Sequence, residues 1–341
     1  MASCRSRRRS SPGNRVEAGL PPGAAGAVNW FSRWRGHPAA ATPAPEGPPS
    51  APAEDPDALP PSERCLFIIG AARSGSTVLQ NALNDSPEIF LFGEPNFHAD
   101  DGTPGFAARY NAMHRSWANQ ENKSSFCPAV LPNDGTWREY LCKLGTYYRF
   151  VGAKLVIEPA RDRAYLDQFF DFQCRNFYRS KYIFTFRAPL PTISSTQQLQ
   201  LLVQGATEEI RHIVRGYAEA ARLYIRMLRN LPHVRAVFLE DADRQTFKGL
   251  EEWLGVPLPG THAYYDRDKI ANHPAPEADG EIHQAIAALE QVYQLLRRAD
   301  QASGPRLQLE QNNNHLRDDH FTLIGDADRR LGMILRDLAP P

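Results

Sequence analysis

Five short apolar runs recur along the chain, and segments with a helical spacing of apolar residues lie between them. The runs are Cys65–Ile69, Ile89–Phe92, Phe150–Ile157, Tyr182–Phe186 and Val234–Leu239, and the helical segments are Tyr165–Tyr178, Thr192–Val203, Glu208–Leu228 and Glu281–Arg297. Apolar runs of this length are typical of buried strands. Because strands that alternate with helices form right-handed βαβ units, the pattern predicts an α/β fold with a mainly parallel sheet and helices on both faces.

A loop of small residues joins the first predicted strand to the helix that follows it. Gly70, four further residues, Gly75 and then Thr77 match the phosphate-loop pattern G-x-x-x-x-G-K-[ST] except at the lysine, which is Ser76. A helix N-terminus supplies unpaired N–H groups and a positive dipole end, so it favours a bound anion. The only cation inside the loop is Arg73. We therefore expect a P-loop-type fold that binds phosphate or sulfate here, and a plain turn is the alternative.

A glutamate follows the second predicted strand, in the sequence Phe92-Gly93-Glu94-Pro95. The proline ends the strand and favours extended geometry at the residue before it. We therefore expect the Glu94 carboxylate at the same sheet edge as the anion loop, where it would act as a general base towards a hydroxyl group. A carboxylate exposed on a surface turn is the alternative.

An arginine and a serine follow the fourth predicted strand. Arg187 closes the strand, and Ser195 falls in about the first turn of the next helix, after the prolines at 189 and 191. A guanidinium makes bidentate bonds to phosphate, and a hydroxyl near a helix N-terminus adds a further donor. The pair predicts a second anion site at the same edge, whereas an arginine paired with a surface carboxylate is the alternative.

Three of these features resemble those of sulfotransferases. Arg73-Ser74-Gly75-Ser76-Thr77 is similar to the family's [KR]-S-G-[TS]-T loop, which holds the 5′-phosphosulfate of 3′-phosphoadenosine 5′-phosphosulfate (PAPS). The spacing of Arg187 and Ser195 resembles the pair that binds the 3′-phosphate, and Gly93-Glu94 resembles the setting of a glutamate in tyrosylprotein and bacterial carbohydrate sulfotransferases. The resemblance covers roughly residues 65–255, and an Arg-Lys-Gly loop found near the end of small-molecule sulfotransferases has no equivalent here.

The resemblance implies a PAPS-dependent sulfotransferase that acts on an acceptor hydroxyl, on a carbohydrate or another small molecule, and releases 3′-phosphoadenosine 5′-phosphate (PAP). It implies that Glu94 is the general base and that Arg73 lies closest to the leaving oxygen, with no metal required. The main rival is a phosphate-loop kinase or triphosphatase, because Glu240-Asp241 after the fifth strand resembles an acid that holds magnesium. A nucleotide-binding scaffold without activity is the third possibility.

The sequence leaves the roles of several further residues open. Lys154 lies within an apolar strand, where we expect it to extend to an edge rather than to contact an anion. His98 is a weaker candidate for the base, and His273 is a candidate for approaching the site. The segment 99–146, which contains Trp117 and Trp137, is predicted to be irregular.

Composition narrows the remaining possibilities. The 341 residues carry equal numbers of basic and acidic side chains, 39 of each, so no overall field points to a nucleic-acid partner. The sequence lacks an apolar run long enough for a membrane helix, and its five cysteines show no C-x-x-C spacing, which favours a reducing, cytoplasmic location. Twelve of the 28 prolines precede residue 63, so we predict a disordered segment at 1–62, an α/β domain at 63–305 and a partly helical extension at 306–341.

Overall fold

The computed structural model describes residues 62–99, 101, 105–118, 135–159, 161–204, 209–258, 279–303 and 318–339. Predictions about the N-terminal segment 1–61 and about His273 fall outside these residues, as do those about the side chain of Trp117. The predicted domain boundaries therefore stay predictions.

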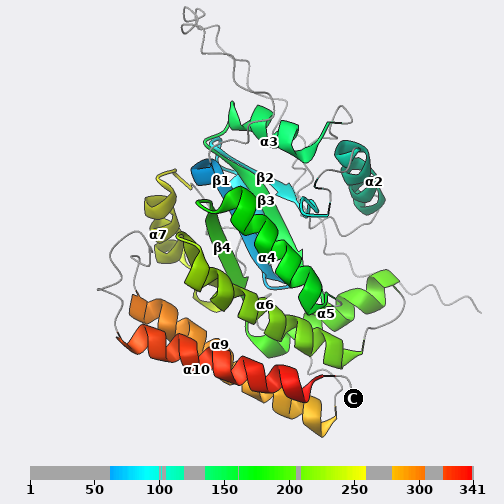
Figure 1. Cartoon of the computed structure of the whole chain (residues 1–341), viewed down its shortest axis with the longest axis vertical. Helices are drawn as coiled ribbons and strands as arrows, with labels where there is room; N and C mark the ends of the chain where they lie inside the picture. The colour runs from blue at the N-terminus through cyan, green and yellow to red at the C-terminus, as the bar shows by residue number, and fades with distance from the viewer. Residues whose placement is uncertain are drawn as a thin grey trace, which may run out of the picture. The chain divides into compact units, whose positions relative to one another are not determined.

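The centre of the fold is a five-stranded, all-parallel sheet (Figure 1). Its strands are β1 (Cys65–Ala71), β2 (Ile89–Gly93), β3 (Phe150–Ile157), β4 (Lys181–Phe186) and β5 (Val234–Phe238), in the spatial order β2-β3-β1-β4-β5. All five predicted strands are confirmed, with ends that differ by no more than two residues. The predicted α/β class with a parallel sheet is therefore confirmed as well.

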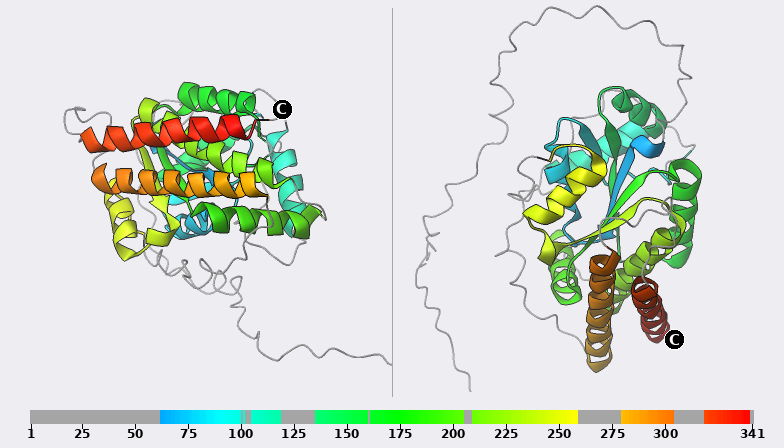
Figure 2. Two further views of the ribbon diagram at one scale, coloured as in Figure 1. Left: turned by 90° about the horizontal axis from the view of Figure 1, so that it is seen from below. Right: turned by 90° about the vertical axis from the view of Figure 1, so that its left-hand side faces the viewer.

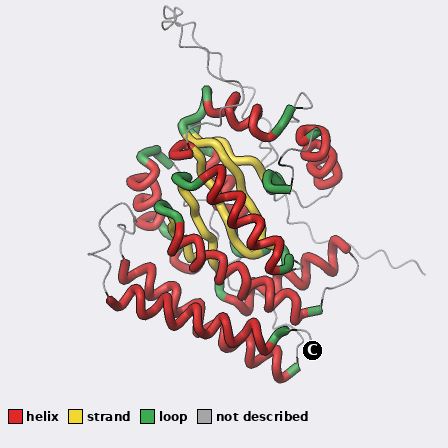
Figure 3. The backbone as a smooth tube through the Cα atoms, in the orientation of Figure 1, coloured by secondary structure: helices red, strands yellow, loops and turns green. Residues whose placement is uncertain are grey.

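Helices cover both faces of this sheet (Figures 1–3). The elements are η2 (Ser62–Arg64), α1 (Ser76–Asn84), α2 (Phe106–Ala118), α3 (Trp137–Gly145), α4 (Arg163–Phe177), α5 (Pro189–Gln204), α6 (Ile210–Asn230), η3 (Leu239–Asp241), α7 (Arg244–Leu254), α9 (Gly280–Ser303) and α10 (Asp318–Asp337). Because successive side chains of a strand point to opposite faces, Phe67 joins a core with α4 and α6, and Ile68 joins one with α1 and α7.

The segment 99–146 contains helices, so the prediction that it is irregular is wrong for its described residues. Thr136 caps α3 by accepting a hydrogen bond from Glu139 N, and the Glu139 carboxylate accepts one from Thr136 N in return. This capping box is readable in the sequence as Thr-x-x-Glu. Trp137, the first residue of this helix, is almost fully buried. Packing in the core therefore accounts for an aromatic residue at this position.

The two C-terminal helices extend the fold beyond the sheet. In Figure 1, α9 (orange) and α10 (red) lie side by side, and α10 also packs against α6. The helix predicted at Glu281–Arg297 is confirmed and is longer, and α10 (Asp318–Asp337) lies within the extension that was predicted to be partly helical. Among the described helices, none combines the length and apolar character needed to cross a bilayer.

The order of the strands determines where a ligand can bind. The chain leaves β1 through α1 towards β2 on one side, and it leaves the neighbouring β4 through α5 and α6 towards β5 on the other. Ligands of open α/β sheets bind at such a switch point, at the carboxyl ends of the strands. Gly70 pairs in register with Thr185, so the loop after β1 and Arg187 after β4 flank this point.

Candidate functional site

The loop between β1 and α1 packs tightly against β4. An added Cβ at Gly70 would lie 2.3 Å from Thr185 Oγ1 and 2.4 Å from Ser74 Oγ, so only glycine fits there. Ser74 is buried, its hydroxyl hydrogen-bonds the Thr185 hydroxyl at 2.8 Å, and its N–H donates to Ala71 O. The Ser74 side chain therefore connects the loop to β4. The prediction that Ser74 binds the ligand was based on the sequence motif and stays a prediction.

The helix that follows the loop begins without a side-chain cap. Gly75 is the N-cap residue of α1 and has a φ of 92°, a left-handed conformation that glycine adopts readily. The first bond into the helix runs from Leu79 N to Gly75 O at 3.1 Å. The N–H groups of Ser76 and Thr77 therefore have no acceptor within the helix, and they lie at the positive end of the helix dipole. This is the arrangement that binds phosphate or sulfate.

Arg73 connects this loop to the second predicted anion site. Its backbone has a φ of 65°, which is uncommon for a residue other than glycine. Its Nε donates a hydrogen bond of 3.0 Å to Oγ of Ser195, which lies 122 residues further along the chain in α5 and is buried. Although the Arg73 residue is exposed as a whole, nearby protein atoms desolvate its guanidinium and lower the pKa of Arg73.

Arg187 lies close to the same point and is 6% exposed. Burial lowers the pKa of Arg187, the positive charge of Arg73 lowers it further, and the carboxylate of Glu240 opposes both effects. An arginine keeps its proton at neutral pH despite such shifts. The two guanidiniums are therefore close enough for the charge of one to act on the other, and such a pair of positive charges favours a ligand with more than one negative charge.

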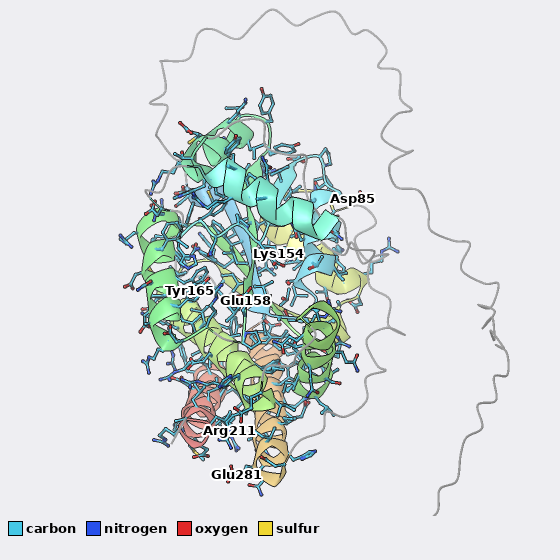
Figure 4. The ribbon with its side chains drawn as sticks, turned by 90° about the vertical axis from the view of Figure 1, so that its right-hand side faces the viewer. Asp85, Lys154, Glu158, Tyr165, Arg211 and Glu281 are labelled. Atoms are coloured by element: carbon cyan, nitrogen blue, oxygen red, sulfur yellow. The ribbon has the colours of Figure 1, made fainter. Side chains whose placement is uncertain are left out.

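The third predicted element of the site, Glu94, forms an ion pair with Lys154. The Lys154 side chain is 0% exposed and that of Glu94 is 23% exposed, and Lys154 Nζ also donates to Thr77 Oγ1 at 3.0 Å. Figure 4 shows Lys154 near the middle of the molecule. The expectation that Lys154 extends to an edge is wrong, because the ammonium instead joins the candidate base to the phosphate loop.

The backbone at Glu94 also differs from the prediction. Its φ is 54°, not the extended value that the following proline favours, although its N–H still donates to Lys154 O at 2.9 Å. Among the described residues other than glycine, Arg73 and Glu94 alone have a positive φ. Such conformations cost about 1–3 kcal/mol each and concentrate at functional sites. Both of the predicted catalytic residues are therefore held in strained backbone geometry.

The acids after β5 are engaged in contacts within the protein. Glu240 accepts a hydrogen bond of 2.8 Å from Ala188 N and another from the Tyr293 hydroxyl, and Asp241 forms an ion pair with Arg297. Neither acid caps α7. Glu240 and Asp241, the pair of acids that supported a magnesium-binding triphosphatase, therefore bind the side chains of Tyr293 and Arg297 in the C-terminal helix α9.

His98 packs against several aromatic rings. Tyr165 and Phe169 pack edge-on against its ring at 4.7 and 5.4 Å between centroids. Burial, aided by the charge of Arg161, lowers the pKa of His98 from 6.5 to about 4. Its Nε2 is buried without a hydrogen-bond partner among the described residues, which makes it a poor candidate for the general base.

The structure thus brings together the phosphate loop, Arg73, Arg187 and Ser195, and it joins Glu94 to the loop through Lys154. The contacts of Lys154 with Thr77 and Glu94 were not predicted from the sequence. The available signal was a single ionisable residue in an otherwise apolar strand, which requires a partner when it is buried. The links from Glu240 to Ala188 and Tyr293 left no local signal at all.

The model of the sulfotransferase family matches residues 65–259, which is more than half of the chain. The chain therefore belongs to the sulfotransferase family, and the resemblance drawn from its motifs is confirmed. It is an enzyme that uses PAPS as the sulfuryl donor. None of the curated proteins matches the chain.

Proposed function

We propose that this sulfotransferase transfers the sulfuryl group of PAPS to a hydroxyl group of a carbohydrate or another small molecule. In this proposal the groups at the sulfuryl end are Arg73, Gly75, Ser76, Thr77 and Lys154, those at the 3′-phosphate are Arg187 and Ser195, and Glu94 is the general base. One observation carries it: Arg73 Nε donates to Ser195 Oγ at 3.0 Å, so the groups for the two ends of one nucleotide are adjacent.

The residues at the sulfuryl end provide positive potential where the reaction needs it. Bound PAPS supplies an activated sulfuryl group, and the phosphate oxygen from which that group departs takes up negative charge. The N-terminus of α1, the Arg73 guanidinium and the Lys154 ammonium are all fixed near this end before any ligand arrives. Preorganised donors of this kind stabilise developing charge without a cost of rearrangement during the reaction.

Glu94 is suited to take the proton of the acceptor hydroxyl. Its Oε1 pairs with Lys154, which orients the carboxylate, while Oε2 has no partner within the described parts of the chain. The acceptor oxygen attacks sulfur as its proton passes to Oε2, so that the sulfate ester forms and PAP leaves. A glutamate in a Gly-Glu setting supports a carbohydrate acceptor through the resemblance to carbohydrate sulfotransferases.

Contacts of the site disfavour a kinase or triphosphatase. Enzymes of that class use the hydroxyl at the position of Thr77 and an acid on a neighbouring strand to hold Mg²⁺. Here Thr77 Oγ1 accepts a hydrogen bond from Lys154, an ammonium that repels a cation, and Asp241 is paired with Arg297. These contacts support the sulfuryl donor over a magnesium nucleotide.

The cysteines support a reducing, cytoplasmic location. Cys65, Cys142 and Cys174 are free thiols, and burial raises the pKa of Cys65 to about 12, which keeps that thiol unreactive. Reduced cysteines are the rule in the cytosol. Cell fractionation tests this part of the proposal, and recovery of the protein in a secretory fraction would contradict it.

A pair of assays tests the proposed function. In a thermal-shift assay, we expect PAP and PAPS to stabilise the protein, and ATP with magnesium to do so much less. In the second assay, radiolabelled PAPS is incubated with a panel of saccharides, phenols and peptides, and we expect label on saccharides. Stronger stabilisation by ATP with magnesium would favour a kinase, and PAPS binding without transfer to any acceptor would favour a scaffold.

A further inference from the structure

The C-terminal helix α9 contacts the segment that follows the carboxyl end of β5. This helix lies beyond the residues that match the sulfotransferase family. Tyr293 and Arg297 are four residues apart on α9, so they occupy one face of the helix. Tyr293 donates to Glu240, and Arg297 pairs with Asp241. Two adjacent acids in η3 are thus held by two adjacent turns of α9.

Glu240 transmits this contact to the residue after Arg187. One of its carboxylate oxygens, Oε1, accepts a hydrogen bond of 2.8 Å from Ala188 N, and the other, Oε2, accepts the one from Tyr293. Because Ala188 N belongs to the peptide that joins it to Arg187, this bond restrains the plane of that peptide and so the backbone at the Cα that carries the arginine side chain. Tyr217 holds the carbonyl of Arg187 with a second bond of 2.8 Å.

The hydrogen bond between Tyr293 and Glu240 is partly buried, and its tyrosine side lies in the core. Tyr293 is 2% exposed and packs edge-on against Phe238, at 5.5 Å between ring centroids. Burial and the hydrogen bond to Glu240 raise the pKa of Tyr293 well above its ordinary value, so its hydroxyl stays protonated and acts as a donor. A partly buried bond of this kind restrains its partners more than an exposed one, because water competes for it less.

We propose that Tyr293 and Glu240 are positioning residues that aim Arg187 at the 3′-phosphate of the nucleotide. The selectivity of the enzyme for 3′-phosphorylated nucleotides then depends on α9, a helix outside the matched family region. This inference rests on the proposed function, in which Arg187 binds the 3′-phosphate. It assigns to α9 a part in donor recognition.

The test compares Tyr293→Phe with Tyr182→Phe in the full chain. Tyr182 is a matched control, because its buried hydroxyl also donates its proton, with Phe177 O at 2.7 Å as an acceptor, and because the residue lies at the start of β4, at the end opposite Arg187. With PAP and adenosine 5′-monophosphate as ligands in calorimetry, we expect Tyr293→Phe to weaken PAP binding by about three- to tenfold and to leave the monophosphate within about twofold. Tyr182→Phe should change neither affinity.

Variants of Glu240 separate the effect of its two hydrogen bonds from the effect of its negative charge. Glu240→Ala should weaken PAP binding by about tenfold or more, since both hydrogen bonds are lost. Glu240→Gln should stay within about threefold of the wild type, because its amide can still accept from Ala188 N and donate to the Tyr293 oxygen. In steady-state assays, Tyr293→Phe should raise the KM for PAPS and leave kcat within about twofold.

The outcomes distinguish this inference from the proposed function. If the wild type binds PAP and the monophosphate equally well, the assignment of Arg187 to the 3′-phosphate fails, and the inference fails with it. If the wild type prefers PAP and Tyr293→Phe keeps the full preference, only the inference is overturned. Equal weakening of both ligands, or a Glu240→Gln variant as weak as Glu240→Ala, would also overturn it.

Discussion

The buried ammonium of Lys154 donates a hydrogen bond of 3.0 Å to the hydroxyl of Thr77, which lies 77 residues earlier in the chain. Thr77 directly follows the position at which a triphosphatase carries its phosphate-loop lysine, and that position is Ser76 here. The cation missing from the loop is therefore supplied by β3 from the side. The same ammonium pairs with Glu94, so one residue connects the donor end of the site with the proposed base.

Glu94→Gln tests the general base. We expect turnover to fall by about 100-fold or more, because the amide does not accept the hydroxyl proton, while the affinity for PAP stays within about threefold. Glu158→Gln is the control, because Glu158 follows β3 at the same edge but is exposed and pairs with Arg161. Steady-state kinetics and calorimetry measure the two quantities. Full turnover in Glu94→Gln would remove Glu94 from the mechanism.

Arg187→Ala tests the site of the 3′-phosphate. The variant should lose far more affinity for PAP than for adenosine 5′-phosphosulfate, by a difference of about 30-fold or more, because a charge-assisted contact is lost only where a 3′-phosphate is present. Arg149→Ala serves as control, since Arg149 immediately precedes β3 at the opposite edge of the sheet. Competition binding gives both affinities, and equal losses for the two nucleotides would refute the assignment.

Lys154→Met tests the link between loop and base. The methionine keeps the apolar stem but removes the ammonium, so we expect turnover to fall by about tenfold or more. The free energy of unfolding should fall by about 1–3 kcal/mol, less than for a fully buried pair because Glu94 is partly exposed.

A double-variant cycle with Glu94→Gln isolates the contribution of the pair. The combined variant should lose less stability than the sum of the two single variants, because each single change already breaks the same ion pair. Denaturant titration of all four proteins measures this. Losses that simply add would contradict an energetic link between the two residues.

Gly70→Ala tests the packing beneath the phosphate loop. The added Cβ would meet Thr185 Oγ1 at 2.3 Å and the Thr185 carbonyl at 2.9 Å, so we expect the free energy of unfolding to fall by about 1–3 kcal/mol and PAP binding to weaken. Gly249→Ala is the matched control in α7, where an added Cβ meets nothing within 4 Å. That change should stabilise the protein by about 0.5–1 kcal/mol. Equal stability of both variants would contradict the packing argument.

The pH dependence of stability tests the environment of His98. The pKa of His98 is about 4 in the folded protein, against 6.5 ordinarily, so below pH 6.5 the unfolded chain binds a proton that the folded protein refuses. The contribution of His98 is therefore fully present above pH 6.5 and is lost as the pH falls towards 4. Allowing for partial exposure of the ring, we expect a loss of about 1–2 kcal/mol, since one pKa unit corresponds to about 1.4 kcal/mol.

His98→Leu removes this titration while keeping a side chain of similar volume. Thermal unfolding between pH 7 and pH 4.5 should show a shallower loss of stability in the variant than in the wild type. The comparison uses the slope with pH and not the absolute stability, because the substitution also changes the packing against Tyr165. Identical slopes would show that His98 titrates normally in the folded protein.

The sequence by itself determined the strands, most of the helices and the phosphate loop of this protein. Those features follow from local patterns: apolar runs become buried strands, and Gly70 and Gly75 bound a loop whose spacing is characteristic of anion sites. The capping box of Thr136 and Glu139 was equally local and would have located α3. Arg187 and Ser195 were also found locally, since both follow the end of a predicted strand.

Only the tertiary structure decided which of these residues meet. The contact of Arg73 with Ser195 and that of Lys154 with Thr77 depend on the strand order β2-β3-β1-β4-β5 and on register, and neither is encoded in any short segment. The positive φ at Glu94 likewise contradicts the local preference before proline, because the ladder with β3 and the buried ammonium outweigh it. Local patterns specify elements, whereas long-range packing and electrostatics bring them together as a site.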